Sequence, residues 1–207
     1  MTTVTVPFLQ NAPCQQTNWH PIANEPWSTS PTHCSAEFQI AHKGDAVYLK
    51  FRIRERFLRA RKREHNGAVH HDNCVEFFFA FPGDESYYNF EFNCLGSLKA
   101  AYGKTRTARK SLAKPIMDRI VDNTSITIDN INEDRRIAWE LSVILDMPTF
   151  SFHRYASLTG LQCNGNFTKC GNGLPKPHFL TWSHIHSENP DFHKKECFGN
   201  INFGGLL

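Results

Sequence analysis

Hydrophobic residues recur at every second position between residues 74 and 94, a pattern that predicts two β-strands. On one side of the first strand the residues are all apolar, namely Val75, Phe77, Phe79 and Phe81. The corresponding residues of the second strand are Tyr88, Phe90, Phe92 and Cys94. Between the two runs, Pro82-Gly83-Asp84 has the composition of a turn. The segment therefore predicts a β-hairpin with one aromatic face.

The second strand of this hairpin carries polar residues on its other face. Asn89, Glu91 and Asn93 form a row about 13 Å long, at about 3.3 Å per residue. Amides and carboxylates together donate and accept hydrogen bonds, so this row suits a hydroxyl-rich ligand. The alternative is that these side chains solvate an exposed sheet face.

Other segments with strand patterns lie before and after this hairpin. They span residues 38–41, 46–55, 125–129, 138–145, 158–169, 178–182 and 198–203. Residues 1–35 are rich in Pro, Asn, Thr and Gln but contain Trp19 and Trp27, which predicts an extended arm packed on the core. We therefore predict a single all-β domain over residues 1–207. Its expected architecture is an antiparallel β-sandwich, immunoglobulin-like or jelly-roll-like, with a few short helical turns.

Composition and charge narrow the classes of partner. The formal net charge is only +3, and the basic stretches 56–68 and 104–114 lack interleaved aromatic residues, so we expect no nucleic-acid partner. No apolar run approaches the roughly 20 residues of a membrane span, and residues 1–19 do not have the pattern of a secretory signal. Seven cysteines without the density of a disulfide scaffold favour a reducing compartment. We expect a cytoplasmic protein, or an extracytoplasmic one if a leader has been removed.

The hairpin and the C-terminal part of the chain resemble a known family. The segment HDNCVEFFF is similar to the strand motif of family 9 carbohydrate-binding modules. The motifs GNFTKCG, PHFLTWSHI, PDFH and FGNINF resemble the C-terminal signature of bacterial modules of this type, and the resemblance extends from about Trp19 to Phe203. It implies a β-sandwich of the kind shared with DOMON domains, which binds the ends of glucan- or xylan-type chains without catalysis and contains structural calcium.

The resemblance also implies residues of a saccharide site. Glu76 and Asn93 match residues that hydrogen-bond sugar hydroxyls, and Trp182 matches one of two aromatic residues that stack on a sugar ring. Two positions depart from the family pattern. Glu91 stands where Arg is expected, and residues 68–71 (AVHH) replace the second aromatic residue.

Further contacts to a saccharide are predicted from neighbouring residues. Asn89 belongs to the polar row, and Arg106 or Arg109 is expected to reach sugar oxygens. Asn166 and Lys169 lie in a predicted Asn/Gly loop that could close over a ligand, because loops often carry binding residues. The alternative is that Asn and Gly are there for turn geometry.

Two other functions remain open at this point. Glu76 and Glu91 could act as the acid and the nucleophile of an intracellular glycan-processing enzyme or its accessory domain, because glycosidases place two carboxyl groups about 5 to 9.5 Å apart. A structural interaction domain without a sugar ligand is the second alternative.

Residues that could bind a metal occur without a regular spacing along the sequence. Asp45 and Asp72 are candidates for calcium, which prefers oxygen ligands. His70 and His71 beside Asp72 form one candidate group for a transition metal. A second group consists of His184, His186, Asp191 and His193, with Cys163, Cys170 and Cys197 nearby in sequence. A haem would need an axial Met or His, and neither Met117 nor Met147 lies in an inward-facing strand pattern.

Overall fold

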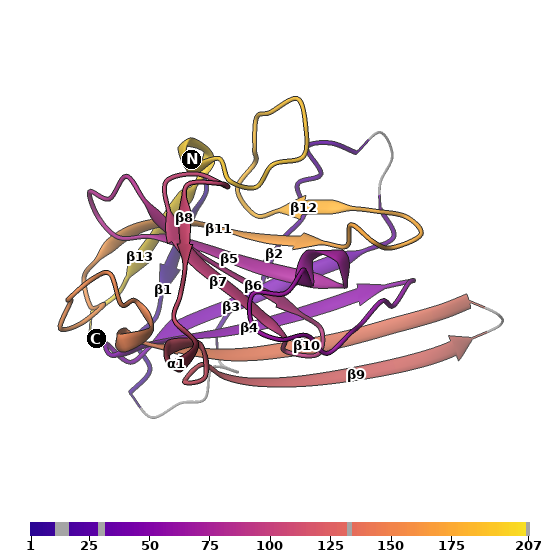
Figure 1. Cartoon of the computed structure of the whole chain (residues 1–207), viewed down its shortest axis with the longest axis horizontal. Helices are drawn as coiled ribbons and strands as arrows, with labels where there is room; N and C mark the ends of the chain where they lie inside the picture. Colours follow the sequence, from indigo (N-terminus) through magenta and orange to yellow (C-terminus); the bar gives the residue numbers. More distant parts are fainter. Residues whose placement is uncertain (11–16, 29–31, 132–133, 206–207) are drawn as a thin grey trace.

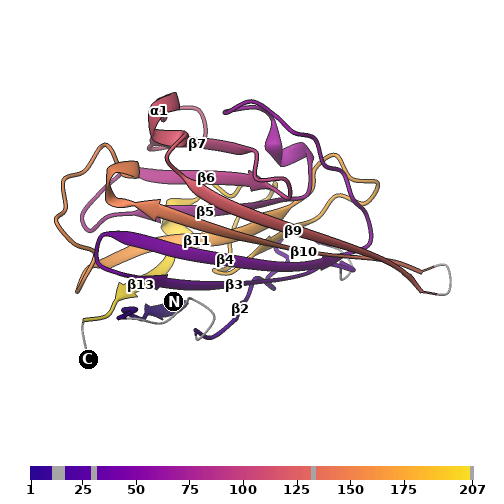
Figure 2. The same cartoon turned by 90° about the horizontal axis from the view of Figure 1, so that it is seen from below.

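The structure is a computed structural model that describes residues 1–10, 17–28, 32–131 and 134–205. Within these residues, thirteen strands form two sheets. The two sheets pack face to face (Figures 1 and 2). The predicted all-β sandwich is confirmed. No helix in the described part of the chain is long and apolar enough to cross a membrane.

The larger sheet has eight strands. In spatial order they are β1 (Thr3–Val6), β13 (Gly199–Phe203), β11 (Gln162–Cys170), β5 (Cys74–Ala80), β6 (Tyr87–Asn93), β7 (Leu98–Gly103) and β8 (Arg109–Ser111), with β12 (Phe179–Thr181) also paired to β11. The predicted hairpin is confirmed as β5 and β6, and Gly83 in its turn has a φ of 78°, a value that favours glycine.

The smaller sheet has five strands, and short helical turns connect some of the elements. The strands are, in spatial order, β2 (His20–Pro21), β3 (Ser35–His42), β4 (Ala46–Glu55), β10 (Asp134–Asp146) and β9 (Val121–Ile131). The helical turns are η2 (Val69–His71), α1 (Lys114–Met117), η3 (Met147–Thr149) and η4 (Lys195–Cys197).

Two parts of the chain form more strand than the sequence indicates. β9 and β10 pair along nearly their whole length and extend past the neighbouring strands (Figures 1 and 2), well beyond the predicted segments 125–129 and 138–145. Residues of the predicted arm also enter the sheets, because β1 pairs with β13 and β2 pairs with β3. The arm residues 11–16 and 29–31 lie outside the described residues.

Aromatic rings fill the space between the sheets. Phe167 of β11 stacks on Phe38 of β3 with 3.5 Å between ring centroids and on Phe77 of β5 with 4.9 Å. All three side chains are completely buried. Because each ring projects inward from a different strand, this stack joins the two sheets.

Truncation of the central ring tests this packing. We expect Phe167→Ala to lower the free energy of unfolding by about 3–5 kcal/mol, because it removes a fully buried ring and leaves a cavity. Urea denaturation measures the change. Val121→Ala removes an apolar side chain that is 58% exposed and should change stability by less than about 0.5 kcal/mol. Equal effects of the two substitutions would contradict the described core.

Candidate functional site

The polar row of β6 lies in the interior of the protein. Asn89, Glu91 and Asn93 are at most 3% exposed, so the alternative in which they solvate an open sheet face is wrong. The segment from residue 171 to 198 covers this outer face, and Phe192 and Phe198 from that segment pack in one buried cluster with Phe78 and Tyr87 of the sheet. The covering segment is visible above β11 in Figure 1.

A pocket lies between this face and its cover. It contains about 500 Å³ of space, including its opening to solvent. Its lining combines carboxylates, cations and aromatic rings. The lining side chains include Glu76, Glu91, Asp191, Lys99, Arg106, Arg109, His70, His193, Phe179 and Phe192.

Two carboxyl groups form the centre of the pocket floor. Glu76 of β5 and Glu91 of β6 are directly opposite each other in the strand register. Burial, together with the charge of Glu91, raises the pKa of Glu76 to about 8. Glu76 therefore holds a proton at neutral pH, and its Oε2 accepts a hydrogen bond of 3.0 Å from the Asn89 amide.

Cations neutralise the second carboxyl group. Lys99 Nζ lies 3.2 Å from Glu91 Oε1, and Arg109 Nη2 lies 3.4 Å from the same oxygen. Arg109 also donates a hydrogen bond to Asn89 Oδ1. Its guanidinium thus links Asn89 and Glu91 of β6. Arg106 is exposed on the loop before β8, and no side-chain partner is found for it among the described residues.

Aromatic rings and histidines complete the walls. Phe179 and Phe192 lie 6.1 Å apart, and each contacts Trp27. His193 Nδ1 lies 2.9 Å from the Tyr87 hydroxyl oxygen. Burial lowers the pKa of His193 to about 3, so its imidazole is neutral. The pocket therefore offers flat apolar surface beside neutral and charged hydrogen-bonding groups.

The structure brings together only some of the predicted site residues. Glu76, Glu91, Arg106 and Arg109 line the pocket. Asn89 is hydrogen-bonded to Glu76 and to Arg109. Sequence reasoning missed Lys99, although its position opposite Glu91 follows from the strand register. Phe179 and Phe192 were not predicted as site residues either, since no periodic pattern marks the covering segment.

Asn93 lies outside the pocket because its amide holds a turn. Its Nδ2 donates to the Arg61 carbonyl and to Asp72, and its Oδ1 accepts from the backbone N–H groups of Leu95 and Ser97. These four bonds use the whole hydrogen-bonding capacity of the amide. The predicted contact from Asn93 to a sugar is therefore not supported.

Trp182 and Asn166 are also structural residues. Trp182 is only 6% exposed, and its ring packs edge-on against Phe38 and Phe167 in the main core, so the predicted stacking on a sugar ring is wrong. Asn166 lies in β11, not in a loop. Its side chain donates to the Ser183 carbonyl and accepts from the Ser183 N–H, which fixes the chain after β12.

Lys169 faces the opposite side of the sheet from the pocket. It is completely buried, and its ammonium donates to Glu55 Oε2 at 3.1 Å and to His178 Nε2 at 2.9 Å. Trp139 Nε1 donates to the other Glu55 oxygen. The predicted position of Lys169 in a loop over the ligand is therefore wrong, because the residue belongs to β11 and pairs with a carboxylate of β4.

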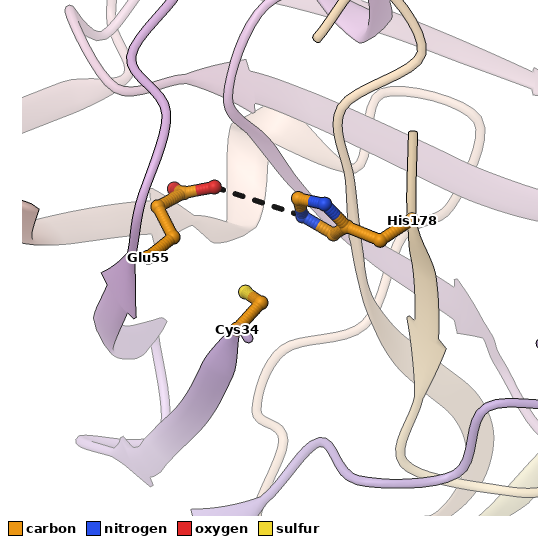
Figure 3. Close-up of side chains that lie close together, drawn as sticks. All are labelled: Cys34, Glu55 and His178. Atoms are coloured by element: carbon orange, nitrogen blue, oxygen red, sulfur yellow. Dashed lines mark ion pairs between the residues drawn. The ribbon is translucent and has the colours of Figure 1, made fainter. Parts of the chain in front are cut away.

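Figure 3 shows Cys34, Glu55 and His178, a group that includes both of the Lys169 partners just named. Cys34, Glu55 and His178 bring three potential metal ligands within 4.8 Å of one another. Burial, together with the charge of Lys169, lowers the pKa of His178 to about 4, and burial raises the pKa of Cys34 to about 12. The Lys169 ammonium already supplies the positive charge of this cluster, so a metal ion would have to displace it.

The calcium candidates do not form an oxygen site. Asp72 is completely buried, and Arg63 donates to both of its oxygens at 2.8 and 2.9 Å. Asp45 is exposed on the turn between β3 and β4. Among the described residues, three potential ligands of the His, Cys, Asp and Glu type meet at two places, and both include thiols. Calcium requires six to eight oxygen ligands, so these residues do not fit it.

The candidate groups for a transition metal are also only partly assembled. The rings of His70 and His71 lie 4.4 Å apart, and those of His184 and His186 lie 4.6 Å apart. Neither pair belongs to a three-ligand group among the described residues. Cys170 does belong to such a group, with partners other than those indicated by the sequence.

Comparison with known proteins identifies the family. Residues 9–203 match carbohydrate-binding family 9, and the chain therefore belongs to that family. No curated protein sequence matches it. The fold is similar to the crystal structure of a candidate carbohydrate-binding protein from Bacteroides uniformis, with a TM-score of 0.86 and 29% identity over 97% of this chain and 98% of the other.

A family 9 module from Caldicellulosiruptor kristjanssonii has the same fold at lower identity. Its complex with glucose aligns with a TM-score of 0.61 and 12% identity, over 100% of this chain and 97% of the module. The complex of a module from that organism with cellotriose gives a TM-score of 0.60 and 12% identity, over 100% and 95%.

Replacement of the buried ammonium tests the role of Lys169. We expect Lys169→Met to lower the free energy of unfolding by about 3–5 kcal/mol, because it leaves the Glu55 carboxylate buried without its cation. Chemical denaturation measures the loss. Lys104→Met, which removes an exposed lysine paired with Glu85, is the control and should leave the denaturation midpoint unchanged. A mild effect of Lys169→Met would refute the buried ion pair.

The pKa of Glu76 has a consequence for the pH dependence of stability. Its usual pKa of 4.5 rises to about 8 in the folded protein, so between these values the folded state holds a proton that the unfolded state has lost. The contribution of this group to stability is therefore complete below pH 4.5 and decreases as the pH rises to 8. We expect the stability of the wild type relative to Glu76→Gln to fall over this range. Denaturation curves at several pH values measure it, and a constant difference would exclude the raised pKa.

Proposed function

We propose that the pocket between the sheet and residues 171–198 binds a saccharide without catalysing its conversion. Membership of carbohydrate-binding family 9 supports this class of function. The modules similar in fold were solved with glucose and with cellotriose, so glucan-type chains are the first ligands to consider.

The composition of the pocket carries the proposal. A sugar ring presents hydroxyl groups around its edge and C–H groups on its faces, so it needs polar groups and flat apolar surface in one cavity. Glu76, Glu91 and Arg109 supply fixed donors and acceptors on the floor, and Phe179 and Phe192 supply rings in the cover. The contacts among the floor residues hold them in place before a ligand arrives, which reduces the entropy lost on binding.

The ring that contacts the sugar differs from the one indicated by the sequence. With Trp182 enclosed in the core, the aromatic surface available in the pocket comes from Phe179 and Phe192 of the covering segment. Phe192 belongs to the irregular part of the cover, whereas Phe179 begins β12 and is paired with Cys170 of β11 in the sheet register. A ligand in the pocket would therefore lie between the sheet and its cover.

Arg106 gives the sharpest test of this site because its removal disturbs no contact found among the described residues. We expect Arg106→Ala to weaken saccharide binding about tenfold or more, since hydrogen bonds from charged donors contribute about 1.5–3 kcal/mol. Phe192→Leu, which keeps an apolar side chain but removes the flat ring, should also weaken binding. Calorimetric titration with glucose, cellotriose and xylotriose measures the affinities.

Arg154→Ala is the matched control, because Arg154 is exposed and does not line the pocket. Its affinity should equal that of the wild type. Chromatography after prolonged incubation should recover the sugar unchanged. Release of reducing sugar that disappears in Glu76→Gln would instead establish an enzyme, and a cooperatively folded protein that binds none of the three sugars would contradict the proposal for these ligands.

A further inference from the structure

Three metal-ligating side chains meet at the floor of the pocket, on the outer face of the larger sheet. Cys74 of β5 and Cys170 of β11 are directly opposite each other in the strand register, and Glu76 follows Cys74 on the same face. One ligand atom from each lies within 4.8 Å of those from the other two. From this arrangement we propose that Cys74, Glu76 and Cys170 bind a divalent cation of the zinc class.

The separation of the ligand atoms suits a shared ion. Cys170 Sγ lies 3.7 Å from Glu76 Oε1. Zn–S bonds of about 2.3 Å and Zn–O bonds of about 2.1 Å, at a tetrahedral angle, place sulfur and oxygen about 3.6 Å apart. Both strands are central in the sheet and pair with a neighbour on each side, so the backbone that carries the ligands is held firmly.

The charge balance distinguishes this cluster from the one around Lys169. There, an ammonium already lies between the carboxylate of Glu55 and the imidazole of His178. At Glu76, the contacts found among the described residues are the Asn89 amide and the Cys170 thiol, and no cation lies within hydrogen-bonding distance. A metal ion would therefore add positive charge where the side chains supply none directly.

The chemistry of the ligand set selects the ion. Two sulfur atoms favour zinc and other thiophilic metals over calcium or magnesium, and a single carboxylate is an ordinary third ligand for zinc. Glu76 and Cys170 line the pocket, which provides a path for entry and leaves the fourth coordination position for water. The inference does not depend on saccharide binding.

Binding of the ion must displace protons. Burial raises the pKa of the Cys74 and Cys170 thiols, and Glu76 is protonated at neutral pH, so all three groups give their protons to solvent as the ion enters. Two thiolates and one carboxylate would leave the zinc complex with one net negative charge. Lys99 and Arg109 face the same pocket and offset that charge.

Cobalt is the spectroscopic probe for this site. The reduced, metal-free protein is titrated with Co²⁺ under nitrogen, and we expect one equivalent to give a sulfur-to-cobalt charge-transfer band in the near ultraviolet. One equivalent of Zn²⁺ should remove the band and raise the melting temperature. Cys74→Ser, Cys170→Ser and Glu76→Gln should each weaken Co²⁺ binding at least tenfold, because each removes one of three ligands.

Cys34→Ser is the matched control, because Cys34 belongs to the other three-ligand cluster; it should leave the titration unchanged. Melting curves establish that each variant is folded, and if the serine variants do not fold, Glu76→Gln still decides the question because it keeps the shape of the side chain. An unchanged band in Cys74→Ser and Cys170→Ser, or no band with the folded wild type, would overturn the proposal. So would a loss of the band in Cys34→Ser, or a Cys74–Cys170 disulfide that forms on exposure of the Zn²⁺-treated protein to air.

Discussion

The pocket depends on how the protein accommodates two buried carboxyl groups, Glu76 and Glu91, at directly opposite positions of neighbouring strands. Like charges at directly paired positions of neighbouring strands repel, and burial strengthens the effect because it removes water. The protein avoids two unpaired charges in different ways on the two strands. Burial keeps a proton on Glu76, whereas Lys99 and Arg109 neutralise Glu91. The short strand β8 thereby contributes a cation, Arg109, to the interior of a site built on β5 and β6.

The pocket has a floor formed by strands of the sheet and a cover formed mostly by irregular chain. Its floor consists of side chains that project from central strands and hold one another through hydrogen bonds, as Arg109 does through Asn89. Its cover is mostly irregular chain, in which Phe192 and His193 are fixed by packing against the sheet. Loops of this kind change more readily than strands, so the cover is where ligand preference can differ between proteins that share the fold.

The alternation of residue types was sufficient to predict the hairpin, the sandwich and the polar row that contains Asn89 and Glu91, whereas Glu76 joined the predicted site through the family resemblance. The alternation could not show that a distant segment buries the polar face, because polar residues alternate in the same way on a covered sheet face and on a face exposed to solvent. Lys169 is an instructive error. Its Asn/Gly surroundings resemble a loop, whereas its partner Glu55 is 114 residues away in sequence, and no local pattern reports that pairing. The prediction for Trp182 was wrong for a related reason. Polar neighbours in the sequence are found beside aromatic residues of the core as well as beside aromatic residues of the surface.

The parallel pairing of β1 with β13 bears on how the protein forms during synthesis. Asn200 and Thr3 are 197 residues apart in sequence, yet their side chains are in contact. Strand β13 lies between β1 and β11 and pairs with both. Neither pairing can form until residues 199–203 have left the ribosome. Contacts between such distant residues form slowly, and until then the edge of β11 is exposed to other chains. The growing polypeptide therefore passes through a period in which its sheet can pair with a neighbour instead of with itself.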